Sequence, residues 1–329
     1  MKRNLNIDFM KTIAILSVIL IHMTSTSQEL ALLAPLHYLL AMPIFMIISG
    51  FNSAKSYSYK NYSNVKEYYD WQKLFKKIIK LWIPYSIVFI IQLLIIFISG
   101  NQLSLTQLIT GFFTGGFGPG GYFMLILIQG ILITPLIYKL MEKNNNIGLV
   151  TMFVISTVTE LMCKIVNINP DIYRILIVRY IFAIAIGIWM AKNKNIKNYL
   201  WISCLSILSV IYIVSVQYYG KIYLTEYMWT AEHAPAYFYV SLIVFVGLHF
   251  YDLNKLGRIG IFVTLIGSKS YYIYLAQMIY FMLPITYSDS NIMIVLQIVL
   301  GFVACILGGV VLEAISKKIT VFKNVKKLI

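Results

Sequence analysis

Long apolar stretches recur along the whole chain and alternate with short polar or charged segments. A helix needs roughly 20 mostly apolar residues to cross a bilayer core about 30 Å thick. Ten stretches approach this length: 6–25, 36–54, 81–99, 121–140, 147–166, 173–191, 199–217, 234–250, 267–285 and 292–315. The pattern therefore predicts an all-α polytopic membrane protein with about ten transmembrane helices.

The composition agrees with a membrane protein. The 329 residues are 60% hydrophobic and 12% charged, with a mean hydropathy of +0.79. A soluble chain would carry about 25% charged residues. The first apolar stretch is interrupted by polar residues, so we interpret it as an uncleaved helix and not as a secretory signal. We expect one integral membrane domain over residues 1–329.

Basic residues gather in alternate loops, and this sets the expected orientation. One side of the membrane would have only four basic residues on or near it: Lys164, Arg174, Arg179 and Lys221. The other 23 of the 27 basic residues would lie toward the opposite side. Positive charge marks the cytoplasmic side, so both termini are predicted to be cytoplasmic. The net charge of +15 is explained by topology and anionic lipid, and no nucleic-acid partner is expected. The three cysteines lie in apolar stretches, so no disulfide or metal site is expected.

Two loops are longer than a turn. The inner segment 55–80 mixes lysines with aromatic residues, which is typical of an amphipathic segment lying on the membrane or of a solvated basic loop. The outer segment 218–233 is rich in tyrosine and carries Trp229, Glu232 and His233. Its aromatic residues are explained by an interfacial belt or by a platform for a sugar ring.

Asp8, Lys11 and His22 interrupt the first predicted helix. The 11 residues from Lys11 to His22 amount to about three turns plus 20°, so both side chains lie on one face, roughly 16 Å apart along the axis. A charge at membrane depth is costly unless it faces protein or water, which makes both residues functional candidates. The alternatives are a Lys11 that extends to the inner surface and an interfacial His22 bonded to a neighbouring helix.

Seven segments follow one another along the chain: DFMKTIAILSVILIH (8–22), MPIFMIISGF (42–51), KKIIKLWIPY (76–85), GPGGYFMLILI (118–128), VRYIFAIAIGIW (178–189), IGSKSYYIYLAQ (266–277) and VLEAISKK (311–318). In this order they resemble motifs of the acyltransferase-3 family of integral membrane acyltransferases. The resemblance covers nearly the whole chain, and ten helices with both ends inside is the topology of that family.

The sequence departs from the family pattern at three positions. Lys11 stands where the family often has arginine, and it keeps the charge without the planar guanidinium. Gln277 stands where many members have histidine, and Glu313 lacks the usual following proline. No soluble esterase-like segment follows the last helix, so a stand-alone member is expected.

The resemblance implies an acyltransferase of the bacterial plasma membrane. It would move an acyl group, expected to be acetyl, from cytoplasmic acyl-CoA to a hydroxyl of an extracytoplasmic carbohydrate or other cell-envelope acceptor. Acyl-CoA is then the donor substrate, with no metal, and membrane lipid surrounds the protein. Assembly into a homo-oligomer is left open.

The resemblance and the residues together suggest roles in such a reaction. Lys11, Lys76, Lys77 and Lys80 would neutralise the CoA phosphates, although topology alone also explains the last three. His22 would act as general base or be acylated itself. Glu313 and Asp8 are further catalytic candidates, and Glu313 alternatively pairs with Lys11. The candidates for acceptor binding are His37, Tyr122, Arg179, Trp229, Glu232 and Gln277.

Two other classes of membrane protein fit the composition. A transporter or flippase of an envelope precursor also has many helices and buried charges. A membrane sensing or binding module is the second alternative. Consumption of a thioester by the purified protein would separate an enzyme from both.

Overall fold

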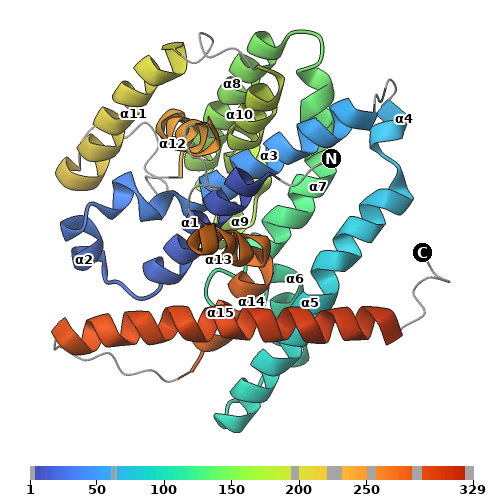
Figure 1. Cartoon of the computed structure of the whole chain (residues 1–329), viewed down its shortest axis with the longest axis vertical. Coiled ribbons are helices and arrows are strands. Elements are labelled where there is room, and N and C mark those ends of the chain that lie inside the picture. The colour runs from blue at the N-terminus through green and yellow to red at the C-terminus, as the bar shows by residue number, and fades with distance from the viewer. Residues whose placement is uncertain are drawn as a thin grey trace. The chain divides into compact units, whose positions relative to one another are not determined.

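The computed structural model describes residues 4–60, 62, 65–193, 200–220, 232–249, 257–283 and 291–322. These residues form α-helices and short 3₁₀ turns, with no β-strand among them (Figure 1). The all-α prediction is confirmed. Each of the ten predicted stretches contains a helix.

The chain divides into two compact units, which are described separately. The first unit comprises residues 1–69 and 132–267, and the second comprises 70–131 and 268–329. The helices of the first unit are α1 (Leu5–Ile21), α2 (Thr26–Ala31), α3 (Ala41–Lys60), α4 (Val65–Tyr68), α8 (Asn145–Ile165), α9 (Pro170–Arg174), α10 (Ile181–Lys192), α11 (Leu200–Tyr219), α12 (Tyr237–His249) and α13 (Gly257–Ser268). Among the described residues of this unit, 3₁₀ turns lie at Ala34–Leu36, Tyr38–Leu40, Ile177–Tyr180 and Ala234–Ala236.

The core of the first unit is the contact between α3 and α10. Gly50 and Gly187 allow this contact, because a methyl group on Gly50 would collide with the Ile184 carbonyl and one on Gly187 with the Ile47 carbonyl. The two backbones therefore meet without side chains between them. Residues 182–190 of α10 are all buried, and α8 packs against the same helix.

Helix α1 is held inside the first unit by α3, α12 and α13. The Asn6 side chain donates a hydrogen bond to the Leu248 carbonyl at 2.9 Å, and the Thr12 hydroxyl donates to the Val263 carbonyl. A methyl group on Gly247 would collide with Met10. The ionisable residues of α1 therefore stand on a helix that protein surrounds on several sides.

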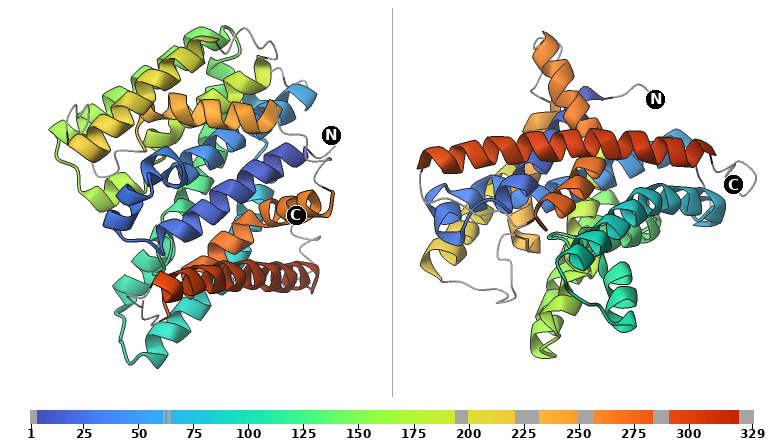
Figure 2. Two further views of the ribbon diagram at one scale, coloured as in Figure 1. Left: turned by 60° about the vertical axis from the view of Figure 1, so that its left-hand side comes forward. Right: turned by 90° about the horizontal axis from the view of Figure 1, so that it is seen from below.

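The second unit contains α5 (Trp71–Ile98), α6 (Leu105–Thr114), α14 (Ser270–Tyr280) and α15 (Asn291–Phe322). Helix α7 (Phe123–Leu140) continues from it into the first unit at Leu132. Helix α14 packs on α15 and α5, and the Tyr271 hydroxyl donates to the Leu81 carbonyl at 2.7 Å. Helix α15 is one continuous rod in both views of Figure 2.

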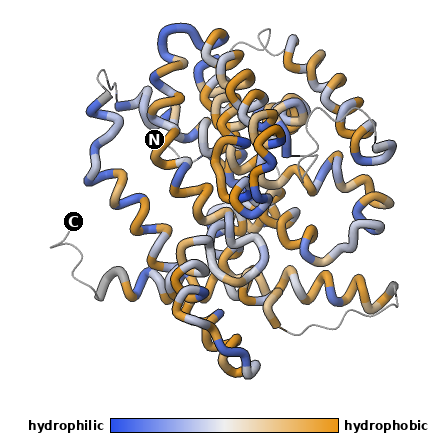
Figure 3. The backbone as a smooth tube through the Cα atoms, turned by 180° about the vertical axis from the view of Figure 1, so that it is seen from behind, coloured by the Kyte–Doolittle hydropathy of each residue, from blue (hydrophilic) through white to orange (hydrophobic). Residues whose placement is uncertain are grey.

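Six helical stretches within the described residues are long and apolar enough to cross a membrane: 38–60, 66–98, 123–140, 145–165, 200–219 and 292–319. The number rises to seven if α13 and α14 form one broken span. Figure 3 shows hydrophobic residues, in orange, along the helices of the protein. Helices α1, α10 and α12 have only 17, 12 and 13 residues, so the predicted count of ten is not confirmed. The protein is nevertheless a multi-pass membrane protein by length and composition.

The boundaries of several predicted segments differ in the structure. Within the inner segment 55–80, α3 continues to Lys60 and α5 begins at Trp71, after an N-cap in which Asp70 accepts from the Lys73 amide. Its tyrosines pack together, because the ring of Tyr57 lies 5.2 Å from that of Tyr68 and 5.1 Å from that of Tyr138. Residues 257–266, expected in a loop, belong to α13.

The orientation of the chain stays a prediction that cysteine labelling can test. In a protein without its native cysteines, Tyr219→Cys should react with an impermeant maleimide added outside intact cells, and Tyr59→Cys should not. Both side chains are exposed and stand on the outer and inner predicted segments, respectively. The predicted difference follows from the distribution of basic residues. Labelling at Tyr59 alone would reverse the topology.

Candidate active site

The N-terminal half of α1 carries an ion pair. Asn4 caps the helix by accepting a hydrogen bond from the Asn6 amide at 3.0 Å. One turn later, the Lys11 ammonium lies 3.8 Å from an oxygen of Asp8, which is only 6% exposed. Asp8 and Lys11, two of the predicted site residues, are therefore brought together by i,i+3 spacing on one helix.

His22 stands at the other end of α1, as its C-cap. Its backbone amide donates to the carbonyls of Ile19 and Leu20, which ends the helix. The structure thus confirms that a single helix separates Lys11 from His22, with roughly 16 Å between them along its axis. Arg174, at the end of α9, is close enough to His22 for the two charges to interact.

Arg179 is the most deeply buried cation of the predicted site. It is 1% exposed and lies 3.2 Å from an oxygen of Glu232. The guanidinium also donates to the Tyr180 hydroxyl, which in turn donates to the same Glu232 oxygen, each at 2.8 Å. Arg179 and Glu232, both predicted to bind acceptor, therefore form one network with Tyr180.

A second acid lies in the same region of the first unit. Glu160 of α8 is 1% exposed and has an oxygen 3.3 Å from Nδ1 of His233. The Tyr237 hydroxyl donates to the Glu232 backbone carbonyl at 2.6 Å, and the Arg179 guanidinium lies 5.9 Å from the centroid of the Tyr173 ring. The buried network is thus built on α8, α9, the turn at Ile177–Tyr180 and the start of α12. Glu160 and His233 are 73 residues apart in the sequence, so spacing along the chain could not reveal this pair.

The segment between α1 and α3 is fastened by tyrosines. The hydroxyl groups of Tyr218 and Tyr239 donate to the carbonyls of Leu30 and Leu36, at 2.9 and 3.0 Å. His37, predicted to bind acceptor, is exposed and its Nε2 lies 2.6 Å from the Leu32 carbonyl oxygen. Burial raises the pKa of Glu29 in this segment, and a hydrogen bond from Thr24 opposes that shift. Trp229 lies outside the described residues.

In the second unit, the three lysines expected to bind CoA stand within the first three turns of α5. Lys77 and Lys80 are exposed and Lys76 is partly buried. At the far end of the sequence, Glu313 of α15 pairs with Lys269 and with Lys317, the latter at 2.8 Å. Glu313 thus has two cationic partners within its own unit. Its predicted pairing with Lys11 stays a prediction.

A double-mutant cycle tests which lysine Glu313 depends on. Lys269→Met, Glu313→Gln and their combination should show a coupling of about 1 kcal/mol or more in the free energy of unfolding, because the pair is largely buried. A matched cycle with Lys11→Met tests the predicted Lys11–Glu313 pair, which requires a coupling of similar size. Coupling near zero with Lys269 would remove the Lys269–Glu313 pair, and coupling near zero with Lys11 would remove the Lys11–Glu313 pair.

The two remaining predicted residues lie at a glycine-rich loop of the second unit. Tyr122 follows this loop directly, and the Gln277 amide donates to the Pro119 carbonyl at 3.2 Å. The Tyr274 hydroxyl donates to the Gly120 carbonyl at 3.0 Å. Among the residues that the structure describes, no group of three His, Cys, Asp or Glu side chains gathers as metal ligands would.

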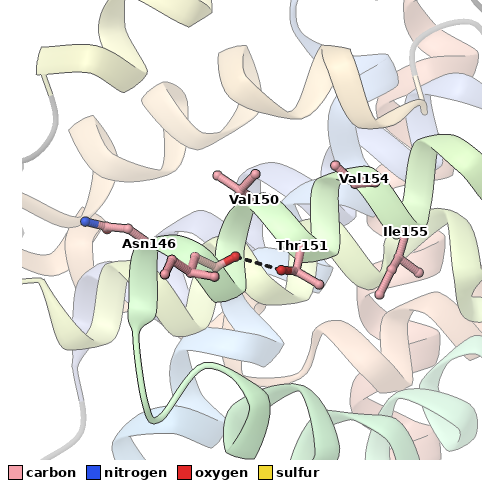
Figure 4. A pocket seen from close by; sticks show the side chains of 6 residues that line it. Asn146, Val150, Thr151, Val154 and Ile155 are labelled. Atoms are coloured by element: carbon pink, nitrogen blue, oxygen red, sulfur yellow. Dashed lines mark hydrogen bonds between the residues drawn. The ribbon is translucent and has the colours of Figure 1, made fainter.

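A groove lies apart from the charged residues, on the exposed face of α8 (Figure 4). Its lining is mostly apolar and includes Val150, Val154 and Ile155. The Thr151 hydroxyl within it donates to the Ile147 carbonyl at 2.9 Å. Such a surface on a candidate membrane helix suits a lipid chain and does not suit a charged substrate.

Comparison with models of protein families identifies the family of this chain. The model of an acyltransferase domain matches residues 4–314, which include Asp8, Lys11, His22, Gln277 and Glu313. The chain belongs to the acyltransferase-3 family. As an acyltransferase-3 protein it carries a membrane acyltransferase domain that extends over both units. The comparisons with curated proteins and with solved structures gave no match.

Proposed function

We propose that the protein transfers an acyl group, acetyl in the simplest case, from cytoplasmic acyl-CoA to a hydroxyl of an extracytoplasmic carbohydrate or other cell-envelope acceptor. The observation that carries this proposal is helix α1 of an acyltransferase domain, which has a cation near one end and a histidine at the other. The expected setting is the bacterial plasma membrane.

The donor would bind at the basic side. CoA carries several phosphate charges, and Lys76, Lys77 and Lys80 offer three ammonium groups within one short stretch of α5. In the first unit, Lys11 is a separate candidate for contact with the donor, held in position by Asp8. The roughly 16 Å from Lys11 to His22 is the order of length of an extended pantetheine arm. The thioester would thus be delivered toward His22.

His22 would supply the proton transfer. A neutral imidazole takes the proton from the acceptor hydroxyl while the oxygen attacks the thioester carbonyl. When the carbon–sulfur bond breaks, the imidazolium returns that proton to the CoA thiolate, so the histidine is regenerated. Arg174 is the cation that interacts with His22, and it is suited to stabilise the oxyanion that forms in between.

The network of Arg179, Tyr180 and Glu232 would form the acceptor side. It offers a guanidinium, a phenol and a carboxylate in a largely buried arrangement, which are the groups that recognise carbohydrate hydroxyls. Tyr173 adds an aromatic face, with the Arg179 guanidinium 5.9 Å from its ring centroid. The Glu160–His233 pair would support this side of the site.

Thiol release from acetyl-CoA tests the proposal. The purified protein in detergent should release free CoA, and an added extract of envelope carbohydrate should increase the rate and take up radiolabelled acetyl groups. The contrary result is a folded protein that releases no thiol and instead moves a carbohydrate precursor across the membrane of vesicles. That result would contradict the proposed enzyme and support a transporter.

A further inference from the structure

The glycine-rich loop at residues 115–121 of the second unit is held by side chains from two helices. The Oε1 atom of Gln92, on α5, accepts from the Phe117 amide at 3.0 Å. From α14, Gln277 Nε2 donates to the Pro119 carbonyl at 3.2 Å, and the Tyr274 hydroxyl donates to the Gly120 carbonyl. Each glutamine thus uses one of the two polar atoms of its side-chain amide in a hydrogen bond to the loop backbone.

The other end of each amide has no hydrogen-bond partner within the described chain. These atoms are Nε2 of Gln92 and Oε1 of Gln277, and both side chains are 0% exposed. A buried polar atom left without a partner destabilises the folded protein. Native proteins retain few such atoms, and each one calls for an explanation.

The orientation of the two amides is fixed by the backbone. Rotating the Gln92 amide by half a turn would bring its NH₂ group against the Phe117 N–H, so two donors would face each other. The same rotation at Gln277 would set its oxygen against the Pro119 carbonyl oxygen. The two side chains that hold the loop therefore offer one donor, Nε2 of Gln92, and one acceptor, Oε1 of Gln277.

The glycines leave space for the Gln92 amide. A Cβ atom on Gly116 would lie 2.5 Å from Gln92 Oε1, and one on Gly118 would lie 2.8 Å from Gln92 Nε2. Gly116 also has a φ of +91°, whereas Gly118 has no such backbone requirement. A Cβ atom on Gly118 would also lie 2.3 Å from the Met278 carbonyl oxygen, so the loop fits closely between the Gln92 amide and α14.

A secondary amide matches this pair of groups, because its carbonyl accepts and its N–H donates. The pantetheine arm of CoA carries such amides between its phosphates and its thioester. Gln92 stands on the same helix as Lys80, a candidate for binding the CoA phosphates. Both candidates for donor binding therefore belong to the second unit.

We propose that Gln92 and Gln277 bind a secondary amide of the pantetheine arm, with Gln92 donating to its carbonyl and Gln277 accepting from its N–H. This assignment rests on the proposed use of acyl-CoA as donor. It makes the two glutamines determinants of donor specificity, with the glycine-rich loop holding them in place.

Calorimetric binding to the purified protein in nanodiscs tests the assignment. Gln92→Met and Gln277→Met should each weaken acetyl-CoA binding about tenfold, the effect of one lost hydrogen bond. Neither should change the affinity for adenosine 3′,5′-bisphosphate, which has phosphates but no pantetheine. Gln72→Met is the matched control, because Gln72 is an exposed glutamine on the same helix α5; it should bind acetyl-CoA as the wild type does.

A change in the ligand avoids any effect on folding. The wild-type protein should bind an acetyl-CoA analogue with a pantetheine amide replaced by a methylene chain about tenfold more weakly than acetyl-CoA. Equal binding of the two ligands would overturn the proposal, as would equal losses for acetyl-CoA and the bisphosphate in both glutamine variants. A wild-type protein that binds the bisphosphate but not acetyl-CoA would overturn this inference, and one that binds neither would overturn the proposed function itself.

Discussion

Replacement of His22 by alanine should lower the turnover of acyl transfer about 100-fold or more while acetyl-CoA still binds. The reason is that a general base acts in the transition state and contributes little to binding of the ground state. Because the imidazole must be neutral to accept the proton, wild-type activity should also fall toward acid pH, and this fall should be absent from the residual rate of His22→Ala. Both effects are measured by thiol release in detergent.

Lys11 supplies the contrast for His22. Lys11→Ala should weaken acetyl-CoA binding and leave turnover at saturating donor largely intact, because it removes a charge contact that exists before the reaction. Lys11→Arg should stay largely active, since the positive charge beside Asp8 is kept. Wild-type rates from a folded His22→Ala protein would exclude the histidine as general base.

Replacement of Arg179 by methionine should lower the free energy of unfolding by about 3 kcal/mol. The change leaves the Glu232 carboxylate, whose side chain is 12% exposed, without its cation, and an uncompensated buried charge is strongly destabilising. Adding Glu232→Gln to Arg179→Met should recover more than half of the loss, because it removes the unpaired charge. Unfolding in detergent, followed by circular dichroism, measures these differences.

Arg258 provides the matched control for Arg179. It lies in the first turn of α13 in the same unit and is exposed, so Arg258→Met should change stability by less than about 0.5 kcal/mol. Equal losses at the two arginines would show that the Arg179 network contributes no specific stability.

The periodic apolar stretches were sufficient to predict the helices, but not their number or all their ends. A search for runs of about 20 apolar residues passes over short helices such as α2 and α6. Both begin with a capping box, at Ser25–Gln28 and Ser104–Gln107, and this local signal could have revealed them. The N-cap at Asp70 similarly marks the start of α5, well before the predicted boundary.

The candidate site was predictable where its residues share one helix. Asp8, Lys11 and His22 are related by helical spacing, so their alignment follows from the sequence. Partners from distant segments do not follow from spacing, and for this reason Tyr180, His233 and Gln92 were missed. A buried acid or amide predicts that a partner exists, but only the fold shows which residue it is.

The backbone contact between α3 and α10 also limits how the first unit can move. Shear motions occur where side chains of two packed helices shift between alternative rotamers as the helices slide. At Gly50 and Gly187 there are no side chains to rearrange, and the Ile184 and Ile47 carbonyls lie directly against the glycines. Sliding would place a residue with a side chain against one of these carbonyls, so the contact fixes the register of α3 and α10. A rocking mechanism, as a transporter requires, would have to avoid this contact, whereas passing an acyl group between fixed residues requires no sliding at all.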